Sequence, residues 1–190
     1  MNVLIFNGSP RKDGNTEVLL QHVAEGIKKG GRKPEIIHLA RLHIHPCTGC
    51  GNCETTGECI WDDDMQPFYI KIPVATRIVI GSPIYFYGVT AQTKAFIDRC
   101  QVFWSRKYLL GETNPNREAR KGFLVCVAAT SGAKIFDSAA LTARYVYDAM
   151  DVTYSGDLFA QGIDEKGSIF TNKEKLKQAV TFGRELCEGP

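Results

Sequence analysis

Short runs of consecutive apolar residues occur at several places along the chain and predict strands. In the first run, VLIF at residues 3–6, no polar residue alternates with the apolar ones. Such a run is typical of a strand buried on both faces of a sheet. Comparable runs recur along the sequence, each followed by small and turn-forming residues. The expected strands lie within residues 3–6, 34–39, 78–80, 122–132 and 151–160.

Apolar residues recur at helical spacing between these runs. In residues 16–29, Leu20, Val23 and Ile27 share one face, and two glycines follow two lysines at the end. Thr90 is suited to be the N-cap of a helix over residues 90–104. A short helix with an Asp cap and Pro67 in its first turn is expected within residues 62–72. The main helices are expected at residues 16–29, 90–104, 138–150 and 172–187.

Strands that alternate with helices imply a parallel sheet with helices on both faces. Five such strands predict an α/β, doubly wound fold of the flavodoxin type, with strand order 2-1-3-4-5 and a ligand site at the carboxyl ends of the strands. We find no repeat or linker, so one domain over residues 1–190 is expected. Residues 40–75 are long for a connection between the second and third strands, which indicates a functional insertion.

Composition and charge narrow the class of protein. With 44% hydrophobic and 23% charged residues, the composition is that of an ordinary globular protein. The net charge of +2 comes from scattered residues and gives no reason to expect nucleic acid or a membrane surface as a partner. No apolar run approaches the roughly 20 residues of a membrane span, and the N-terminus lacks the features of a signal peptide. We therefore expect a cytoplasmic protein with reduced thiols.

Four of the seven cysteines fall in one short stretch, HPCTGCGNCETTGEC, with the spacing C-x2-C-x2-C-x5-C. Zinc sites usually combine two pairs of ligands from separated segments. Three thiolates so close together resemble the start of a bacterial ferredoxin motif, although the fourth cysteine differs in spacing and no proline follows it. The spacing favours a [4Fe–4S] cluster, with zinc, free thiols or an opportunistic disulfide as alternatives. The four residues are Cys47, Cys50, Cys53 and Cys59.

The loop NGSPRKDGNT, residues 7–16, follows the first strand and opens the first helix. Its two glycines permit close backbone approach, Ser9 and Thr16 offer hydroxyl groups, and Arg11 offers charge. The N-terminus of a helix adds unpaired N–H groups that favour an anion. The loop is neither a P-loop nor G-x-G-x-x-G. It indicates a site for a monophosphate dianion; the alternative is a turn-rich loop with Thr16 as helix cap.

Two further loops follow the third and fourth strands. GSPIYFYG, residues 81–88, places three aromatic side chains between two glycines, and a flat heteroaromatic ligand needs such a surface with N–H donors beside it. ATSGAK, residues 129–134, could close the same pocket. The alternative for the aromatic residues is packing in the core or across a dimer contact.

Three segments together resemble a known family: GSPRKDGNT, GSPIYFYGVTAQTKAFIDR and the cysteine stretch. They are similar to NAD(P)H-dependent FMN reductase-like flavoproteins, and most similar to the iron–sulfur flavoprotein branch, which combines FMN with a [4Fe–4S] cluster. The resemblance covers about residues 1–135. It implies that the FMN phosphate is held by Ser9, Arg11, Asn15 and Thr16. It implies that the isoalloxazine is flanked by Pro83, Ile84, Tyr85, Phe86 and Tyr87. Ser131 and Gly132 would be a weaker third contact, and Asp98 and Arg99 would serve only in helix pairing.

The leading hypothesis is a flavin-dependent oxidoreductase that transfers electrons. A donor such as a ferredoxin or NAD(P)H would reduce the cluster, and FMN would pass electrons to a small-molecule or protein acceptor, with no side chain acting as acid or base. The resemblance implies that subunit assembly brings the cofactors together, in a homodimer or homotetramer. One alternative is an NAD(P)H-dependent flavin, quinone or azo reductase with structural cysteines. Another is a non-enzymatic FMN-binding redox sensor.

Overall fold

The sheet has five parallel strands in the order β2-β1-β3-β4-β5. The structure is a computed structural model and describes residues 2–188. The strands are β1 (Val3–Asn7), β2 (Pro34–His38), β3 (Arg77–Pro83), β4 (Lys121–Val127) and β5 (Thr153–Ala160). The observed strand order confirms the predicted flavodoxin-like fold.

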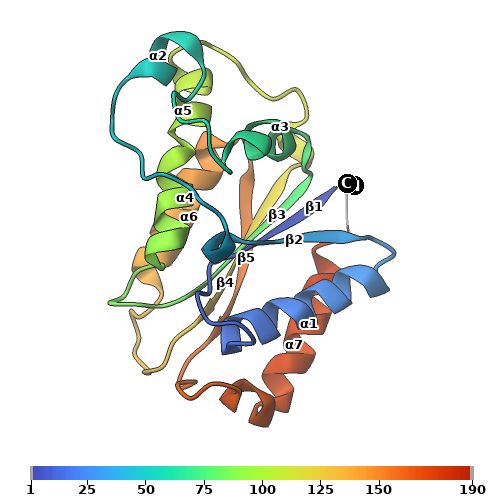
Figure 1. Cartoon of the computed structure of the whole chain (residues 1–190). Coiled ribbons are helices and arrows are strands. Elements are labelled where there is room, and N and C mark those ends of the chain that lie inside the picture. Colours follow the sequence, from blue (N-terminus) through green and yellow to red (C-terminus); the bar gives the residue numbers. More distant parts are fainter. Residues whose placement is uncertain (1, 189–190) are drawn as a thin grey trace.

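Helices cover both faces of the sheet (Figure 1). One face is covered by α1 (Asn15–Lys29) and α7 (Lys173–Glu185). The other face is covered by α3 (Gln66–Val74), α4 (Ala91–Arg99), α5 (Gln101–Tyr108) and α6 (Asp137–Ala149). The connections contain the short α2 (Asn52–Thr56) and the 3-10 turns η1 (Leu39–Arg41), η2 (Arg117–Ala119) and η3 (Ser168–Thr171).

Each strand sends alternate side chains into two separate cores. In β1, Val3 and Ile5 face α1 and α7, whereas Leu4 and Phe6 face the layer that contains α3 and α4. All five residues of β1 are buried, as its continuous apolar run predicts. The central strands are therefore fixed from both sides, and the loops that follow their carboxyl ends start from rigid positions.

The helices α1 and α7 touch through two glycines. A Cβ atom on Gly26 would lie 2.0 Å from the carbonyl oxygen of Val180. A Cβ atom on Gly183 would lie 2.0 Å from the carbonyl oxygen of Val23. Because no larger residue fits at either position, the two helix backbones are in direct contact, and α1 is held firmly against the sheet.

The single helix predicted over residues 90–104 is wrong, because the structure has two helices that meet at Cys100. The N–H of Cys100 bonds to the carbonyl of Ile97, three residues back, at 3.0 Å. A tighter turn of this kind ends one helix while its apolar side chains still face the same core, so the apolar spacing does not reveal the break. Thr90 is the N-cap of α4 as predicted, since its hydroxyl accepts the N–H of Thr93.

The predicted Asp cap of the next helix is also wrong. Met65 occupies the N-cap position of α3, without a capping side chain, although Pro67 does lie in the first turn. Asp63 accepts the N–H of Met65 at 3.0 Å from outside the helix, and its carboxylate is also bound by Arg99.

Among residues 2–188 we find no helix with the length and apolar character needed to cross a membrane.

Candidate functional site

The loop between β1 and α1 is tied at its start to β3 and α4. The N–H of Gly8 donates to the carbonyl of Gly81 at 2.7 Å, and the carbonyl of Gly8 accepts from the Thr90 hydroxyl at 2.8 Å. A Cβ atom on Gly8 would lie 1.8 Å from the hydroxyl oxygen of Thr93. Gly8 is therefore required for the close approach of this loop to α4.

The rest of the loop curls around a small opening at the N-terminus of α1. The Ser9 hydroxyl accepts the N–H of Arg11 at 3.3 Å, and the carbonyl of Arg11 accepts the N–H of Gly14 at 3.2 Å. Since α1 begins at Asn15, the N–H groups of its first turn have no partner within the helix. Within the described part of the chain, the Thr16 hydroxyl has no hydrogen-bond partner either. The opening thus presents neutral donors and the positive end of a helix dipole.

The side chain of Asn15 serves a different contact. Its amide nitrogen donates to the carbonyl of Glu165 at 2.8 Å, and its oxygen accepts the N–H of Gly167 at 2.9 Å and of Ile169 at 3.3 Å. The carboxamide therefore fastens the β5–α7 connection to the start of α1. The predicted contact of Asn15 with phosphate stays a prediction, now through its backbone N–H.

The aromatic loop after β3 is a tight hairpin. The backbones of Tyr85 and Gly88 exchange two hydrogen bonds of 2.9 Å. Phe86 and Tyr87 at the tip have φ angles of 49° and 63°, a left-handed conformation that bulky residues rarely adopt. Strain of this kind costs roughly 1–3 kcal/mol per residue. The turn leaves the Phe86 ring fully exposed, which is unusual for so large an apolar group.

The phosphate loop and the loop after β3 line one cavity of about 90 Å³. The cavity is lined by Ser9, Arg11, Gly14, Asn15, Thr16, Pro83, Ile84, Tyr85, Val127, Ala129, Ile163 and Asp164. Seven residues of the predicted FMN site are thus brought together, whereas Phe86, Tyr87, Ser131 and Gly132 are not in this lining. Ile163 and Asp164 were missed, because the loop after β5 carries no motif. The one sequence signal for these two residues was that their loop follows a predicted strand, because ligands of such sheets bind at the carboxyl ends of the strands.

This cavity fits the phosphate end of FMN. Its volume is well below the roughly 300–1,000 Å³ that encloses a drug-sized ligand, so a flavin ring would lie outside it. The hydroxyl groups of Ser9 and Thr16, the helix N-terminus and the charge of Arg11 are suitable donors for a dianion. The ring would then rest near the aromatic hairpin at residues 85–88.

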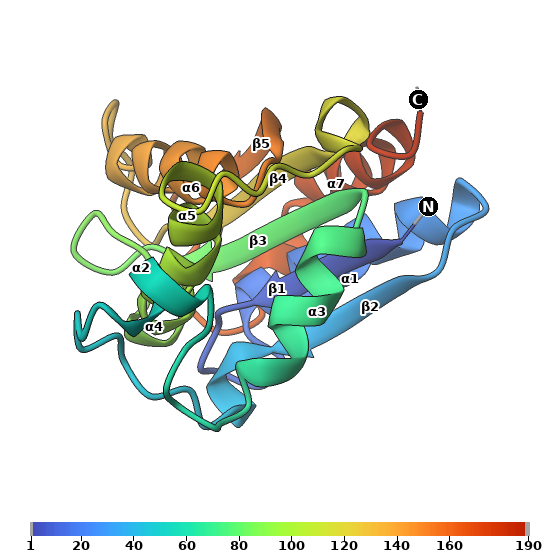
Figure 2. The same ribbon diagram turned by 90° about the horizontal axis from the view of Figure 1, so that it is seen from above.

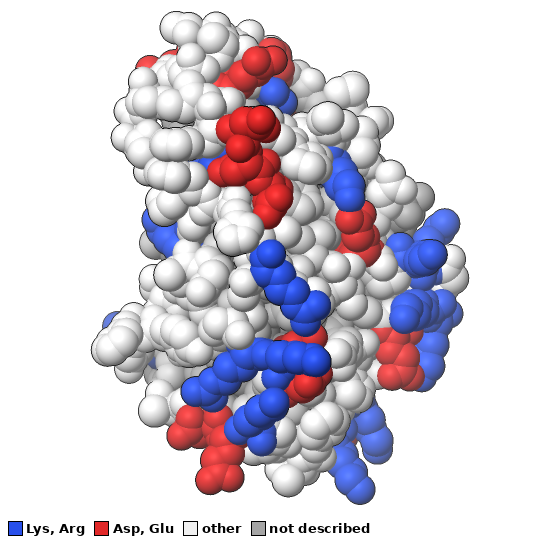
Figure 3. Space-filling model, viewed as in Figure 1, with Lys and Arg blue, Asp and Glu red and all other residues white. Residues whose placement is uncertain are grey.

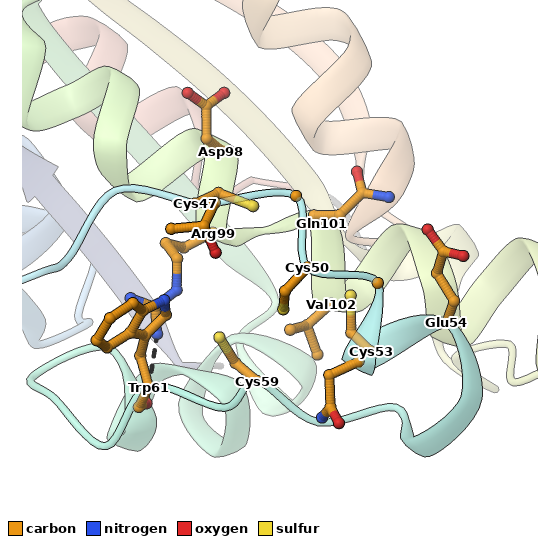
Figure 4. A pocket seen from close by; sticks show the side chains of 14 residues that line it. Cys47, Cys50, Cys53, Glu54, Cys59, Trp61, Asp98, Arg99, Gln101 and Val102 are labelled. Atoms are coloured by element: carbon orange, nitrogen blue, oxygen red, sulfur yellow. Dashed lines mark hydrogen bonds between the residues drawn. The ribbon is translucent and has the colours of Figure 1, made fainter.

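A second cavity, of about 390 Å³, contains all four clustered cysteines. Figure 4 shows the side chains of Cys47, Cys50, Cys53 and Cys59 around this cavity. All four are free thiols, half-buried at Cys53 and Cys59 and exposed at the other two. The segment lies between β2 and β3; that it is an insertion relative to related proteins stays a prediction.

Helix α5 holds the cysteine segment in place. The buried hydroxyl of Ser105 donates to the sulfur of Cys53 at 3.3 Å. The Nε of the next residue, Arg106, donates to the carbonyl of Gly57 at 2.7 Å. These two contacts fasten the cysteine segment to α5.

Arg99 anchors the same segment from α4 and is almost fully buried, at 1% exposed. Its guanidinium donates to the carbonyl of His45 at 2.8 Å and to the carboxylate of Asp63 at 2.6 and 3.2 Å. Burial lowers the pKa of Arg99, but hydrogen bonds to Asp63 and Tyr69 outweigh it and raise the pKa. Helix pairing alone was the wrong role for Arg99, whereas Asp98 does pair with Lys94 within α4, at 2.7 Å.

The four cysteines fit a cluster better than a single ion. A zinc ion with Zn–S bonds of about 2.3 Å needs tetrahedral sulfurs about 3.8 Å apart. Within residues 2–188, no three Cys, His, Asp or Glu side chains are gathered closely enough to hold one metal ion. A [4Fe–4S] cluster binds each thiolate to a different iron, so its four ligands surround a wider space. The 390 Å³ cavity between the thiols suits that arrangement.

Acidic side chains gather around the cysteine cavity. Figure 3 shows red side chains over the segment from α2 to α3, where Glu54, Glu58, Asp62 and Asp64 are exposed, and Glu54 also lines the cavity. Arg99 is the basic residue of the cavity wall itself. A buried positive charge beside thiolates offsets part of their mutual repulsion.

Comparison with known proteins identifies the family. The family model described as NADPH-dependent FMN reductase matches residues 1–165. This chain belongs to the NADPH-dependent FMN reductase family. The membership confirms the resemblance to this family seen in the sequence.

Within this family, the chain is similar to proteins named iron–sulfur flavoproteins. It is 40% identical over 99 residues to one from Methanocaldococcus jannaschii and 43% identical over 110 residues to one from Archaeoglobus fulgidus. The matches cover 52% and 58% of this chain and 51% and 54% of those relatives, so the chain spans about half the length of the curated relatives it matches.

The fold of this FMN reductase family member is also found in solved structures. An NAD(P)H:quinone oxidoreductase from Methanothermobacter marburgensis superposes with a TM-score of 0.74 at 17% identity, over 100% of this chain and 98% of that one. At this identity the likeness concerns the fold alone. It agrees with the strand order, which can be followed in Figure 2.

Proposed function

We propose that this protein is an FMN-dependent oxidoreductase that passes electrons between a [4Fe–4S] cluster and FMN, and from there to an acceptor. One observation carries the proposal: four free thiols of a single segment line one cavity, in a chain of the FMN reductase family. The archaeal relatives named iron–sulfur flavoproteins support it. The cluster ligands would be Cys47, Cys50, Cys53 and Cys59.

The cofactors would supply the redox chemistry, since a cluster exchanges single electrons and a flavin exchanges one or two. The chain binds and tunes them. Ser9 and Thr16 would hold the phosphate, and the aromatic hairpin would support the flavin ring. Ser105 and Arg99 keep the thiols in place and provide donor and charge beside them. No side chain is needed as an acid or base.

The two cavities share no lining residue. Each cofactor would therefore be held by its own part of the chain. We propose that a second subunit brings the two sites together in a homodimer or homotetramer, as the resemblance to iron–sulfur flavoproteins implies. The proposed donor is a ferredoxin or NAD(P)H, the acceptor a small molecule or a protein, and the proposed location the cytoplasm.

Metal and flavin analysis of protein purified without oxygen tests the proposal. We expect roughly four irons and four sulfides per chain, about one FMN, and visible absorbance that dithionite bleaches. The double variant Cys50→Ser/Cys53→Ser should lose the iron and keep the FMN. Cys187→Ser, which changes a cysteine outside the cavity, is the matched control and should keep both. Zinc, or no metal, in the wild-type protein would refute the cluster.

A second candidate is an NAD(P)H-dependent reductase with structural cysteines. It is favoured by the family description, which names NADPH, and by the separation of the FMN cavity from the cysteines. In that case Cys50→Ser/Cys53→Ser should still reduce its flavin rapidly with NADPH. Slow reduction by NADPH and rapid reduction through iron would favour the first candidate. Neither activity, with reversible thiol oxidation, would favour a redox sensor.

A further inference from the structure

Trp61 forms part of the wall of the cysteine cavity (Figure 4). Its indole ring is stacked on the ring of His45, with centroids 3.6 Å apart and planes at 12°. Its carbonyl accepts from the side-chain amide of Gln66 at 2.7 Å. Ring and backbone are thus both fixed, and the indole has a defined place beside the thiols.

The indole N–H of Trp61 has no acceptor. Among the described residues, its Nε1 is the one buried side-chain nitrogen or oxygen that lacks a hydrogen bond. An indole nitrogen can only donate, and a buried donor without a partner costs about 1–3 kcal/mol. Such groups are rare in folded proteins and usually mark a missing partner. Because Trp61 lines the cavity of the four cysteines, a group bound in that cavity can supply the acceptor.

The acceptor chemistry that the cavity offers is sulfur. Thiolates and inorganic sulfides of an iron–sulfur cluster accept N–H hydrogen bonds, and such bonds stabilise the more negative, reduced form. The chain already directs one donor at a cysteine of this cavity, the hydroxyl of Ser105 at the sulfur of Cys53. Trp61 would supply a second donor.

We propose that the indole N–H of Trp61 donates a hydrogen bond to a sulfur of the [4Fe–4S] cluster and raises its reduction potential. Trp61 is then a positioning and tuning residue for electron transfer. The inference rests on the proposed function, because it needs the cluster, but it assigns a role that the four cysteines alone do not give.

Trp61→Phe tests the bond, because phenylalanine keeps an aromatic ring against His45 and removes the N–H. The matched control is Trp104→Phe, which changes the other tryptophan of the chain, on α5 and outside this cavity. Iron, sulfide and FMN content is measured first, and then the midpoint potential of the cluster by an anaerobic redox titration followed by electron paramagnetic resonance. We expect Trp61→Phe to shift the potential to more negative values and Trp104→Phe to leave it unchanged.

Labelling gives a direct measurement that does not depend on how well Trp61→Phe loads iron. In Trp104→Phe grown with [15N-indole]tryptophan, the sole label is Trp61, and a 15N hyperfine coupling should appear on the reduced cluster. An iron-loaded protein without that coupling, or with equal potentials in Trp61→Phe and wild type, would overturn the inference and leave the proposed function intact. Wild-type protein without iron would instead refute the proposed function, and the inference with it.

Discussion

Gly8 stands where the phosphate loop passes closest to α4. Its missing side chain leaves room for the Thr93 hydroxyl, which would lie 1.8 Å from a Cβ atom. We expect Gly8→Ala to lower the free energy of unfolding by about 2 kcal/mol, since overpacking of a tight site typically costs 1–3 kcal/mol. Urea denaturation of the apoprotein measures this change.

The control for Gly8→Ala is Gly132→Ala. A Cβ atom on Gly132 would meet no atom within 4 Å, so this variant should unfold at the wild-type urea concentration. Equal losses in the two variants would show that the contact with Thr93 is not what restricts residue 8.

Phe86 and Tyr87 hold an uncommon backbone conformation at the tip of the hairpin. Replacing them by Asn and Gly, the residues that this turn type prefers, should relieve strain and raise the free energy of unfolding by about 1–2 kcal/mol. The same variant should bind FMN more weakly, because the aromatic surface is lost. Denaturation and flavin titration measure the two effects. A variant that gains stability and keeps full FMN affinity would exclude the hairpin from flavin binding.

One of the contacts that anchor the cysteine segment is an ion pair between α4 and the residues before α3. Arg99 and Asp63 are 2.6 Å apart, and both are largely buried. Removing one partner of a buried pair costs about 3 kcal/mol, so Asp63→Asn should lower the free energy of unfolding by that order. It should also speed the reaction of the cysteines with a thiol reagent. Asp62→Asn, one residue away and exposed, is the control and should do neither.

The same pair predicts a pH dependence. Burial acts to raise the pKa of Asp63, but hydrogen bonds from Arg99 and the N–H groups of His45 and Met65 outweigh it, so the pKa is lowered. A carboxyl group of this kind stabilises the folded state above its unfolded-state pKa, about 3.9. The stabilisation is lost as the pH falls through the lower folded-state value. Wild type and Asp63→Asn should therefore differ in stability at pH 7 and converge in strongly acidic solution; a constant difference would contradict this.

Most helices and strands were predictable from the sequence. Strands buried on both faces appear as continuous apolar runs, and helices appear as apolar residues that recur every three or four positions. The break at Cys100 was not predictable, since both helices keep the same buried face. For the site, motifs at the strand ends predicted the loops that line the 90 Å³ cavity, and the cysteine spacing predicted the metal ligands; both roles stay predictions. The roles of Arg99 and Trp61 were not predicted. A buried guanidinium and an unpaired indole N–H can be recognised only from their surroundings in the fold, which residues distant in sequence provide.

The whole molecule should respond to FMN as a single folding unit would. Ligand at about 100 times its dissociation constant adds about 2.7 kcal/mol of stability. For a chain of this length, that corresponds to a rise of roughly 5–10 °C in the thermal midpoint. Riboflavin, which lacks the phosphate, should give a much smaller rise at the same concentration. Equal shifts with FMN and riboflavin would contradict binding through the phosphate loop.

The glycine contact between α1 and α7 joins segments that leave the ribosome at very different times. Helix α1 is complete at Lys29, but α7 starts only at Lys173. During synthesis, the face of α1 that carries Gly26 stays uncovered until α7 has been translated. The nascent chain therefore exposes an apolar strip during this interval, and transiently exposed apolar surface is what chaperones bind.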